Sequence, residues 1–304
     1  MIDFEALSDL TLMSQKVEPS DYLQMIQDNG KKHELECWGE LRKKYESVLE
    51  LGYDLSTPER IETTRQAMVK GVDIIFQGAL QVEQFIARPD FIVRVDTPSK
   101  LGPYSYEVKD SKLSRFAKAD AVLQLMHYSE VISHTQGFLP QQAYLILGDK
   151  LEKKFDVQNY FFYFRNLKKR FLNFFVKSHD RSTLPLPLPC AHCEMCHWRN
   201  YCNDSWLEAD HLVQVAGINR DQIIKFNQAG IQTMEALANL SREAKVKDIG
   251  RATFLRLQQQ AKLQVRSRAE GSKPLYELIM ADEAGIRSQS EYLPDDHGLG
   301  KLPN

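Results

Sequence analysis

The sequence lacks any uninterrupted hydrophobic run of the roughly 18 to 20 residues that a membrane-spanning helix needs. Its first residues, Met1 to Glu5, also lack the basic and then apolar pattern of a secretory signal. We therefore expect no membrane among its partners and a cytoplasmic location.

The sequence also lacks an excess of charge of either sign. Its 39 lysines and arginines nearly balance its 41 aspartates and glutamates, which leaves a formal net charge of -2. The whole molecule is therefore not attracted strongly to a polyanion, and binding to one would depend on local patches. The 304 residues, 43% of them hydrophobic, suffice for one large core plus a smaller module, or for two domains.

Cysteine is scarce outside one short segment. Four of the five cysteines form the pattern C-x2-C-x2-C-x5-C, namely Cys190, Cys193, Cys196 and Cys202. Four thiolates this close in sequence suit a tetrahedral metal centre, either structural Zn2+ or an iron-sulfur cluster, and the spacing does not separate the two. The fifth cysteine, Cys37, is expected to be a small core residue.

Hydrophobic periodicity predicts a mixed α/β region over residues 1–183. The spacing of apolar residues between 22 and 51 predicts one or two helices, interrupted near Gly30. A further helix is expected from Thr57, as its cap, to Lys70, with Pro58 in the first turn. Three neighbouring strands are expected at 71–80, 85–95 and 104–113, followed by a helix at 117–132, a strand at 143–147 and a helix at 160–176.

The pattern changes after residue 183. A leucine-proline repeat cannot be helical and leads into the cysteine-rich segment, which we place at 184–209. Residues 210–268 have helical patterns with glycines at the junctions and resemble a helix-hairpin-helix module, whose exposed N–H groups bind the DNA backbone. Residues 269–304 are expected to be a linker or tail. The basic residues of the helical segment are Lys245, Lys247, Arg251, Arg256, Lys262, Arg266 and Arg268.

Two acid-x-Lys pairs compete within the strand expected at 104–113. One is Glu107 with Lys109, and the other is Asp110 with Lys112. Side chains alternate across a strand, so Asp110 and Lys112 share the face of the apolar Val108, whereas the other pair faces away. A carboxylate and an ammonium on an inward face are costly unless a divalent ion and a phosphate make use of them. The pair is either solvated, as charged side chains usually are, or part of a site, and in the second case Asp110 and Lys112 are the candidate residues.

Three more polar residues flank this pair in the expected fold. Asp90 begins or flanks the preceding strand and can supply a second carboxylate to the same metal. On the helix at 117–132, Gln124 and Tyr128 lie on the stripe that faces the sheet. Their polar ends therefore need partners, either within the core or in a substrate.

Four sequence elements of this chain occur in a recognisable order. They are Gly30-x-x-His33-Glu34, Asp90, Asp110-x-Lys112 and Gln124-x-x-x-Tyr128. In this order and at these spacings the sequence resembles the RecB-like nucleases of the PD-(D/E)XK superfamily. The resemblance implies an α/β, restriction-endonuclease-like fold with a mixed central sheet flanked by helices. It also implies a metal-dependent DNA nuclease that acts in repair, recombination or defence against foreign DNA.

The same resemblance implies a role for each matching residue. His33, Asp90 and Asp110 would bind Mg2+ or Mn2+. Lys112 would steer the attacking water and steady the charge on the phosphate, and Glu34 would orient the site. The expected DNA contacts are Gln124 and Tyr128.

The cysteine segment resembles a RecB-like subfamily as well. The run from His192 to Cys202 is similar to the segment that closes a [4Fe-4S] cluster on the nuclease domain of those relatives, which favours iron-sulfur over zinc. Those relatives have a fourth cysteine shortly after a Ser-Asp-Leu near the N-terminus, but none follows Ser8-Asp9-Leu10 here. The fourth ligand is then Cys190 or Cys37, of which we choose Cys190.

Two other functions stay open from the sequence. One is a catalytically silent DNA-binding scaffold that serves a helicase or an RNase H-like exonuclease partner. Longer members of the family have a stretch similar to the one from Gly298 to Asn304 before such an exonuclease domain. The other is a zinc-ribbon adaptor in which the acidic residues are incidental.

Overall fold

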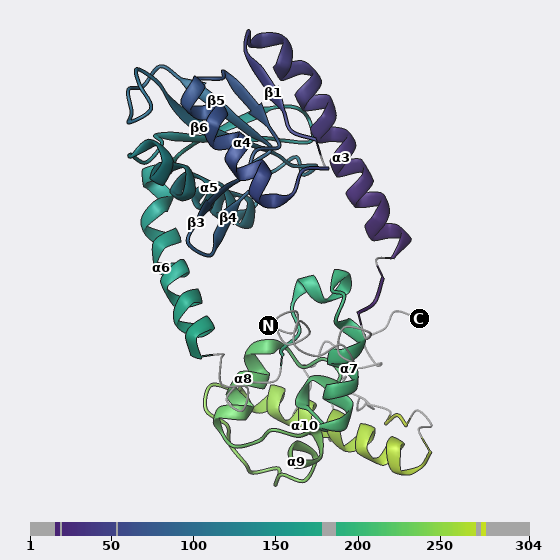
Figure 1. Cartoon of the computed structure of the whole chain (residues 1–304). Coiled ribbons are helices and arrows are strands. Elements are labelled where there is room, and N and C mark those ends of the chain that lie inside the picture. Colours follow the sequence, from purple (N-terminus) through teal and green to yellow (C-terminus); the bar gives the residue numbers. More distant parts are fainter. Residues whose placement is uncertain (1–15, 19, 53, 178–186, 272–274, 278–304) are drawn as a thin grey trace, which may run out of the picture. The chain divides into compact units, whose positions relative to one another are not determined.

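The computed structural model describes residues 16–18, 20–52, 54–177, 187–271 and 275–277. The chain divides into two compact units, one of Ser20–Leu184 and one that joins Met1–Pro19 to Pro185–Asn304. Figure 1 shows the β-sheet in the first unit and the C-terminal helices in the second. Ser8-Asp9-Leu10, most of the expected tail and the stretch from Gly298 to Asn304 lie outside the described residues.

A mixed six-stranded sheet forms the centre of the first unit, in the order β1-β2-β5-β6-β7-β8. The two central strands, β5 and β6, are antiparallel, whereas β6 and β7 are parallel, as are β1 and β2. The α/β class expected from the sequence is confirmed. The sheet strands are β1 (Val48–Glu50), β2 (Ile74–Phe76), β5 (Phe91–Val95), β6 (Ser105–Ser111), β7 (Gln142–Ile146) and β8 (Glu152–Asp156).

The expectation of three neighbouring strands between residues 71 and 113 was wrong in number. A separate hairpin of β3 (Leu80–Val82) and β4 (Phe85–Ala87) lies between β2 and β5 in sequence. Turns divide the two long segments: Gln77 has a positive φ of 58° after β2, and Pro89 lies between β4 and β5. Because proline cannot donate a ladder hydrogen bond, the strand expected at 85–95 is divided into β4 and β5.

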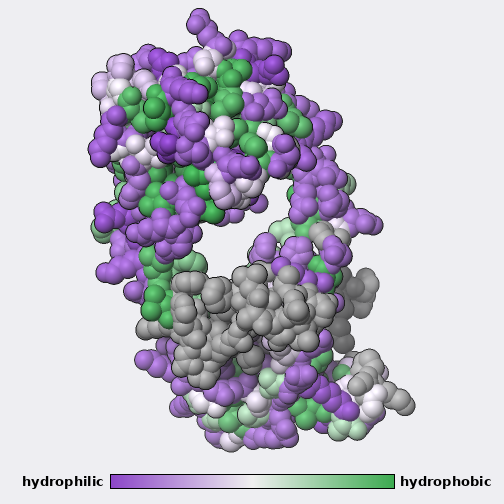
Figure 2. Space-filling model, in the orientation of Figure 1, coloured by the Kyte–Doolittle hydropathy of each residue, from purple (hydrophilic) through white to green (hydrophobic). Residues whose placement is uncertain are grey.

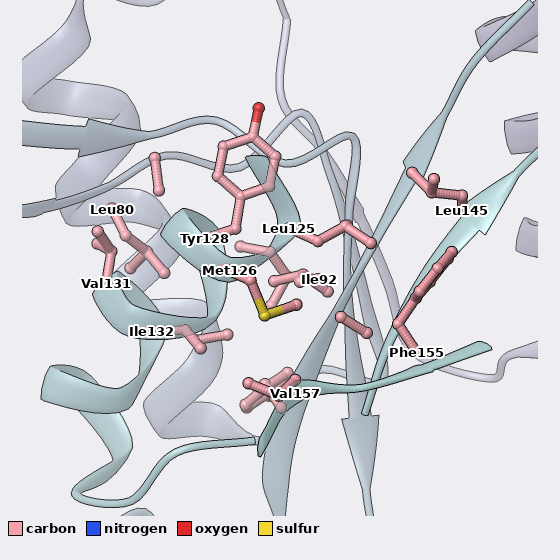
Figure 3. Close-up of a cluster of buried hydrophobic side chains, with 14 of the residues drawn as sticks. Leu80, Ile92, Leu125, Met126, Tyr128, Val131, Ile132, Leu145, Phe155 and Val157 are labelled. Carbon is pink, nitrogen blue, oxygen red and sulfur yellow. The ribbon is translucent and has the colours of Figure 1, made fainter. Parts of the chain in front are cut away.

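Helices cover both faces of this sheet. On one face, α4 (Thr57–Lys70), α5 (Ala119–Gln136) and α6 (Val157–Lys177) contribute to a hydrophobic core with the inward side chains of the strands. Figure 3 shows part of this core, where Leu125 and Met126 of α5 pack near Ile92 of β5. On the other face, α3 (Asp21–Leu41) packs its C-terminal half against a second cluster, followed by the short 3-10 helix η1 (Arg42–Lys44).

The interruption expected in the first helix is absent, because α3 continues through Gly30. A glycine inside a helix costs only about 1 kcal/mol relative to alanine. Trp38 stacks on Phe76 with ring centroids 4.8 Å apart, and Cys37 and Leu41 are also buried, so packing outweighs this cost. Helix α3 begins after Ser20, whose hydroxyl accepts a hydrogen bond from the Leu23 N–H.

Helix α4 has the bounds that its capping signals predict. The cap is Ser56 rather than the expected Thr57, and a reciprocal capping box joins Ser56 to Glu59. Pro58 lies in the first turn, and Gly71 ends the helix with a left-handed φ of 76°. No helix among the described residues is long and apolar enough to cross a membrane.

The regular elements described in the second unit are all helices, apart from an isolated bridge between His211 and Thr233. Gly217 precedes α8, Gly230 joins α8 to α9, and Gly250 caps α10, so each expected glycine lies at a helix junction. Its elements are η3 (Ala191–Met195), α7 (Arg199–Glu208), η4 (Leu212–Gln214), α8 (Arg220–Gln228), α9 (Met234–Ala238) and α10 (Arg251–Ala269).

Residues 16–18 contact the cysteine segment, although their sequence position falls in the expected nuclease core of 1–183. The Val17 N–H donates to the His197 carbonyl at 2.9 Å, and His197 Nδ1 lies 2.8 Å from the Val17 carbonyl oxygen. Lys16 places its ammonium 5.3 Å from the centroid of the Trp198 ring. These contacts belong to the second unit.

Candidate active site

Asp90 and Asp110 lie opposite each other at one rim of the sheet. The antiparallel register pairs Phe91 with Lys109, and one step beyond it brings Asp90 opposite Asp110. Residues that oppose each other across an antiparallel pair project from the same face. That face is the one covered by α5, because Val108 on the same side of β6 lies in the α5 core.

Asp90 is fixed by the end of β6. Its Oδ2 atom accepts hydrogen bonds from the Ser111 N–H at 2.7 Å and from the Ser111 hydroxyl at 2.6 Å. Burial raises the pKa of Asp90, and the Ser111 hydrogen bonds and the nearby Lys112 ammonium oppose this rise. The carboxylate therefore has a defined position next to β6.

Asp110 is buried and carries an ion pair with Lys112. Its side chain is 3% exposed, whereas that of Lys112 is 32% exposed and reaches solvent. Burial and the Asp90 charge raise the pKa of Asp110 to about 7, against the effect of Lys112. Asp110 and Lys112 thus meet at the end of the buried face, as strand alternation predicts.

The competing acid-x-Lys pair faces the other side of β6 and makes structural contacts. Glu107 is buried and accepts a hydrogen bond from the Gln142 N–H at 3.1 Å. Lys109 pairs with Glu152 at 2.6 Å and lies over the Tyr144 ring at 4.5 Å. Both faces of β6 are therefore covered by other parts of the first unit. The sequence pattern did not predict this, because it indicated one inward and one outward face.

Glu34 of α3 shares the electrostatic environment of the two aspartates. Burial raises its pKa to about 7, the charges of Asp90 and Asp110 add to the rise, and Gln77 and Lys112 oppose it. The Gln77 side-chain amide donates a hydrogen bond to the Glu34 carboxylate. Helix α3 therefore contributes a third carboxylate near Asp90 and Asp110.

His33 is adjacent in sequence but has a different contact. It is 7% exposed, and its Nε2 atom lies 3.7 Å from the Cys37 sulfur one helical turn away. Its positive form would lower the pKa of Asp90, which places the imidazole within electrostatic range of that carboxylate. His33 is therefore near the rim, but its described contact is with Cys37.

Gln124 and Tyr128 form a polar pair on α5. The Gln124 amide donates to the Tyr128 hydroxyl oxygen at 2.5 Å. Figure 3 shows the Tyr128 hydroxyl pointing away from the apolar side chains around its ring. Burial and the charges of Asp110 and Asp90 raise the Tyr128 pKa, so this hydroxyl faces the same carboxylates and stays protonated.

Gln77 and Arg60 support the site and were not found by sequence reasoning. The Gln77 N–H donates to the Asp90 carbonyl at 2.8 Å, and Arg60 donates to the Gln77 carbonyl at 2.7 Å. Gln77 has a positive φ of 58°, a conformation that a residue other than glycine adopts at some cost. A glutamine at a left-handed turn has no sequence signature, so only the backbone geometry identifies it.

The donor set of the rim suits a divalent cation in its chemistry. The three carboxylates of Glu34, Asp90 and Asp110 repel one another and are partly removed from water, so keeping them ionised costs free energy. A hard cation bound between them would lower that cost. Among the described residues, however, no group of three or more His, Cys, Asp or Glu side chains lies close enough together to hold a metal ion. Instead, Lys112 pairs with Asp110 Oδ2, and Ser111 donates to Asp90 Oδ2. The Glu34 carboxylate accepts from Gln77.

The four clustered cysteines lie together in the second unit. The sulfurs of Cys190 and Cys193 are 3.9 Å apart, and the Cys196 sulfur accepts a hydrogen bond from the Trp198 N–H at 3.4 Å. Burial raises the pKa of Cys202, and the nearby Cys196 and Cys193 thiolates add to this rise. The thiols are thus near one another, but as they are arranged no three of them could hold a metal ion among the described residues.

Cys37 belongs to the core of the first unit instead. It is 3% exposed and packs with Trp38 and Leu41. Burial raises the pKa of its thiol to about 11, which keeps it neutral. These contacts are those of the small core residue expected from the sequence.

Comparisons with known proteins give no assignment. No family model matches the sequence, and no curated protein matches it. The function must therefore be argued from the residues at the rim of the sheet, where the structure brings together Glu34, Asp90, Asp110, Lys112 and Tyr128.

Proposed function

We propose that this protein is a metal-dependent DNA nuclease that hydrolyses phosphodiester bonds in repair, recombination or defence. The observation that carries the proposal is the opposition of Asp90 and Asp110 across β5 and β6, with Lys112 beside them. The mixed sheet with helices on both faces is compatible with the restriction-endonuclease-like, PD-(D/E)XK architecture that the motif order suggests.

Asp90, Asp110 and His33 would hold Mg2+ or Mn2+. The bound ion would supply charge neutralisation at the phosphate and lower the pKa of water. Glu34 keeps its position through Gln77, and with a pKa of about 7 it can take up a proton near neutral pH. His33 and Glu34 project from α3 and Asp110 from β6, and Asp90 directly precedes β5.

Lys112 supplies the positive charge for the substrate. Its ammonium pairs with Asp110 in the free protein and is exposed enough to contact a phosphate oxygen. Because charge on the phosphate grows during hydrolysis, an ammonium fixed at that position stabilises the transition state more than the substrate. Gln124 and Tyr128 present an amide and a hydroxyl as hydrogen-bond donors to the DNA.

The second unit would bind the cofactor cluster and DNA. We assign Cys190, Cys193, Cys196 and Cys202 to a [4Fe-4S] cluster, with structural Zn2+ as the alternative. The glycine junctions before α9 and α10 and the basic residues of α10 support a helix-hairpin-helix-like contact with the DNA backbone. A helicase or an RNase H-like exonuclease is the proposed protein partner.

Cleavage of end-labelled single- and double-stranded DNA in Mn2+ tests the proposal. Lys112→Ala should lower the cleavage rate by at least about 100-fold, because one fixed charge at the transition state is lost. The matched control is Lys109→Ala, two residues earlier on the same strand but on the opposite face, which should cleave at the wild-type rate. Equal loss in both variants would contradict the assignment of the site.

A catalytically silent scaffold is the second candidate. It is favoured by the Asp110–Lys112 ion pair and by the absence, among the described residues, of any three His, Cys, Asp or Glu side chains that could hold a metal ion. In that case the wild-type protein would bind DNA but leave it intact in Mg2+ and in Mn2+.

A further inference from the structure

A cavity of about 360 Å³ lies directly beside the proposed site. Lys112 at the end of β6 and Gln124 of α5 line one part of it. The loop at 113–118, which joins β6 to α5, supplies Ser114, Phe116 and Lys118. The proposed hydrolysis uses none of these three loop residues.

The loop has a defined shape. The Ser114 hydroxyl donates to the Phe116 carbonyl at 2.8 Å, and the Ser114 carbonyl accepts from the Gly148 N–H at 3.1 Å. A side chain at position 148 would meet the Leu113 carbonyl oxygen at 2.1 Å, so only glycine allows this close approach. The loop is thereby attached to the end of β7 rather than free in solvent.

Phe116 is 79% exposed on this loop. An aromatic ring this exposed leaves most of its apolar surface uncovered by the protein, and covering that surface is favourable. Lys112 and Lys118 provide two ammonium groups on the same cavity, and Asp120 provides one carboxylate, which accepts from the Ala121 N–H. An aromatic ring beside cationic groups is the combination that binds single-stranded nucleic acids.

We propose that Phe116 forms a stacking platform for one unpaired base next to the phosphate that Lys112 contacts, with Lys118 on the following phosphate. This inference rests on the proposed nuclease function, because it takes Lys112 as the residue at the cleaved bond. A base inside a duplex already stacks on its neighbours and cannot lie on this ring. The site therefore selects an unpaired nucleotide within the substrate.

Binding measured without cleavage tests the platform. Fluorescence anisotropy of the full chain in EDTA would compare a short labelled thymidine oligonucleotide with an abasic oligonucleotide of the same length. Phe116→Ala should weaken binding of the thymidine oligonucleotide by roughly 5- to 100-fold, the range for loss of one stacked base. It should leave binding of the abasic oligonucleotide unchanged, and Phe116→Trp should bind both as the wild type does.

The matched control is Phe162→Ala, which removes a phenylalanine of the same 79% exposure from α6. The platform is overturned if Phe116→Ala binds the thymidine oligonucleotide as tightly as Phe162→Ala does, or if it weakens the abasic oligonucleotide equally. If either result is found while Phe116→Ala still cleaves DNA, the platform is refuted but the nuclease proposal is retained. Base-dependent binding without any cleavage would refute the nuclease and retain the platform.

Discussion

At the scale of single residues, the candidate site concentrates negative charge where the fold removes water. Asp90 and Asp110 lie opposite each other, Glu34 adds a third carboxylate, and Lys112 is the ammonium that pairs with Asp110. Burial is the first cause of the raised pKa of all three acids. Such a cluster costs stability unless a positive ligand completes it, which is the usual condition of a functional site.

His211 gives a pH prediction for the second unit. It is 6% exposed, its Nδ1 atom accepts a hydrogen bond from the Val213 N–H at 3.2 Å, and burial lowers its pKa from 6.5. Because the unfolded chain takes up the proton first, the contribution of neutral His211 to stability is complete above pH 6.5 and is lost as the pH falls below that value.

We expect the free energy of unfolding in urea, followed by tryptophan fluorescence, to fall through this group as the pH is lowered below 6.5. His211→Asn keeps an acceptor but does not titrate, so its pH dependence should be flatter. Identical pH profiles for the two proteins would show that His211 is not responsible.

Residue-level prediction worked where a simple rule decides the geometry. Strand alternation placed Asp110 and Lys112 on the face of Val108, as observed, but it did not predict that Glu107 and Lys109 on the opposite face are covered as well. Gln77 could not be found in this way, because its position depends on a left-handed turn and a contact with Glu34, 43 residues away in sequence.

At the scale of elements, the site depends on how α3 reaches the end of the sheet. Gly30 lies inside this helix, three residues before His33. A Cβ atom at position 30 would approach Leu113 Cδ1 no closer than 3.9 Å, which is an ordinary contact. The folded protein therefore has no steric need for glycine there.

Gly30→Ala should raise the free energy of unfolding by about 0.5–1 kcal/mol, because alanine loses less backbone entropy in a helix. Gly71→Ala is the matched control: Gly71 has φ of 76° and a Cβ there would lie 3.3 Å from the Tyr104 ring, so this variant should be destabilised. Chemical denaturation of both variants decides the point, and a loss of stability in Gly30→Ala would contradict this account of α3.

Elements with explicit start and stop signals were predictable, and short or charged ones were not. The Pro58 and Gly71 signals predicted the first turn of α4 and its end at Lys70, although the cap is Ser56 and not the expected Thr57. Strand β8 carries Glu152, Lys153 and Lys154, which are exposed, so it has no hydrophobic pattern and was not expected. Strand β1 has only three residues, too few for a period to be recognised.

At the scale of the whole molecule, each unit has its own hydrophobic core. The sheet unit buries side chains from α4, α5 and α6, and the helical unit buries side chains from α8, α9 and α10. Figure 2 shows hydrophobic residues at the surface along α6, where Phe162, Tyr163 and Phe174 are exposed. The two units divide between Leu184 and Pro185, and the contact of residues 16–18 with His197 was not expected, because it joins distant parts of the sequence.

The cluster proposal predicts different effects for two buried cysteines. In protein purified without oxygen, Cys202→Ser should lose visible thiolate-to-iron absorbance and bound iron, because one of four ligands is removed. Cys37→Ser should retain both, since Cys37 lies in the core of the other unit. Bound zinc in place of iron would support the structural alternative, and loss of iron in Cys37→Ser alone would contradict the ligand assignment.

The central claim is that Asp90 and Asp110 hold one divalent cation together, and calorimetric titration of the full chain with Mn2+ tests it most directly. Asp90→Asn and Asp110→Asn should each weaken Mn2+ binding by at least about tenfold, because each removes one charged oxygen ligand. Glu107→Gln, which neutralises a buried carboxylate on the opposite face of β6, should bind as the wild type does. Wild-type Mn2+ affinity in both aspartate variants would contradict the claim.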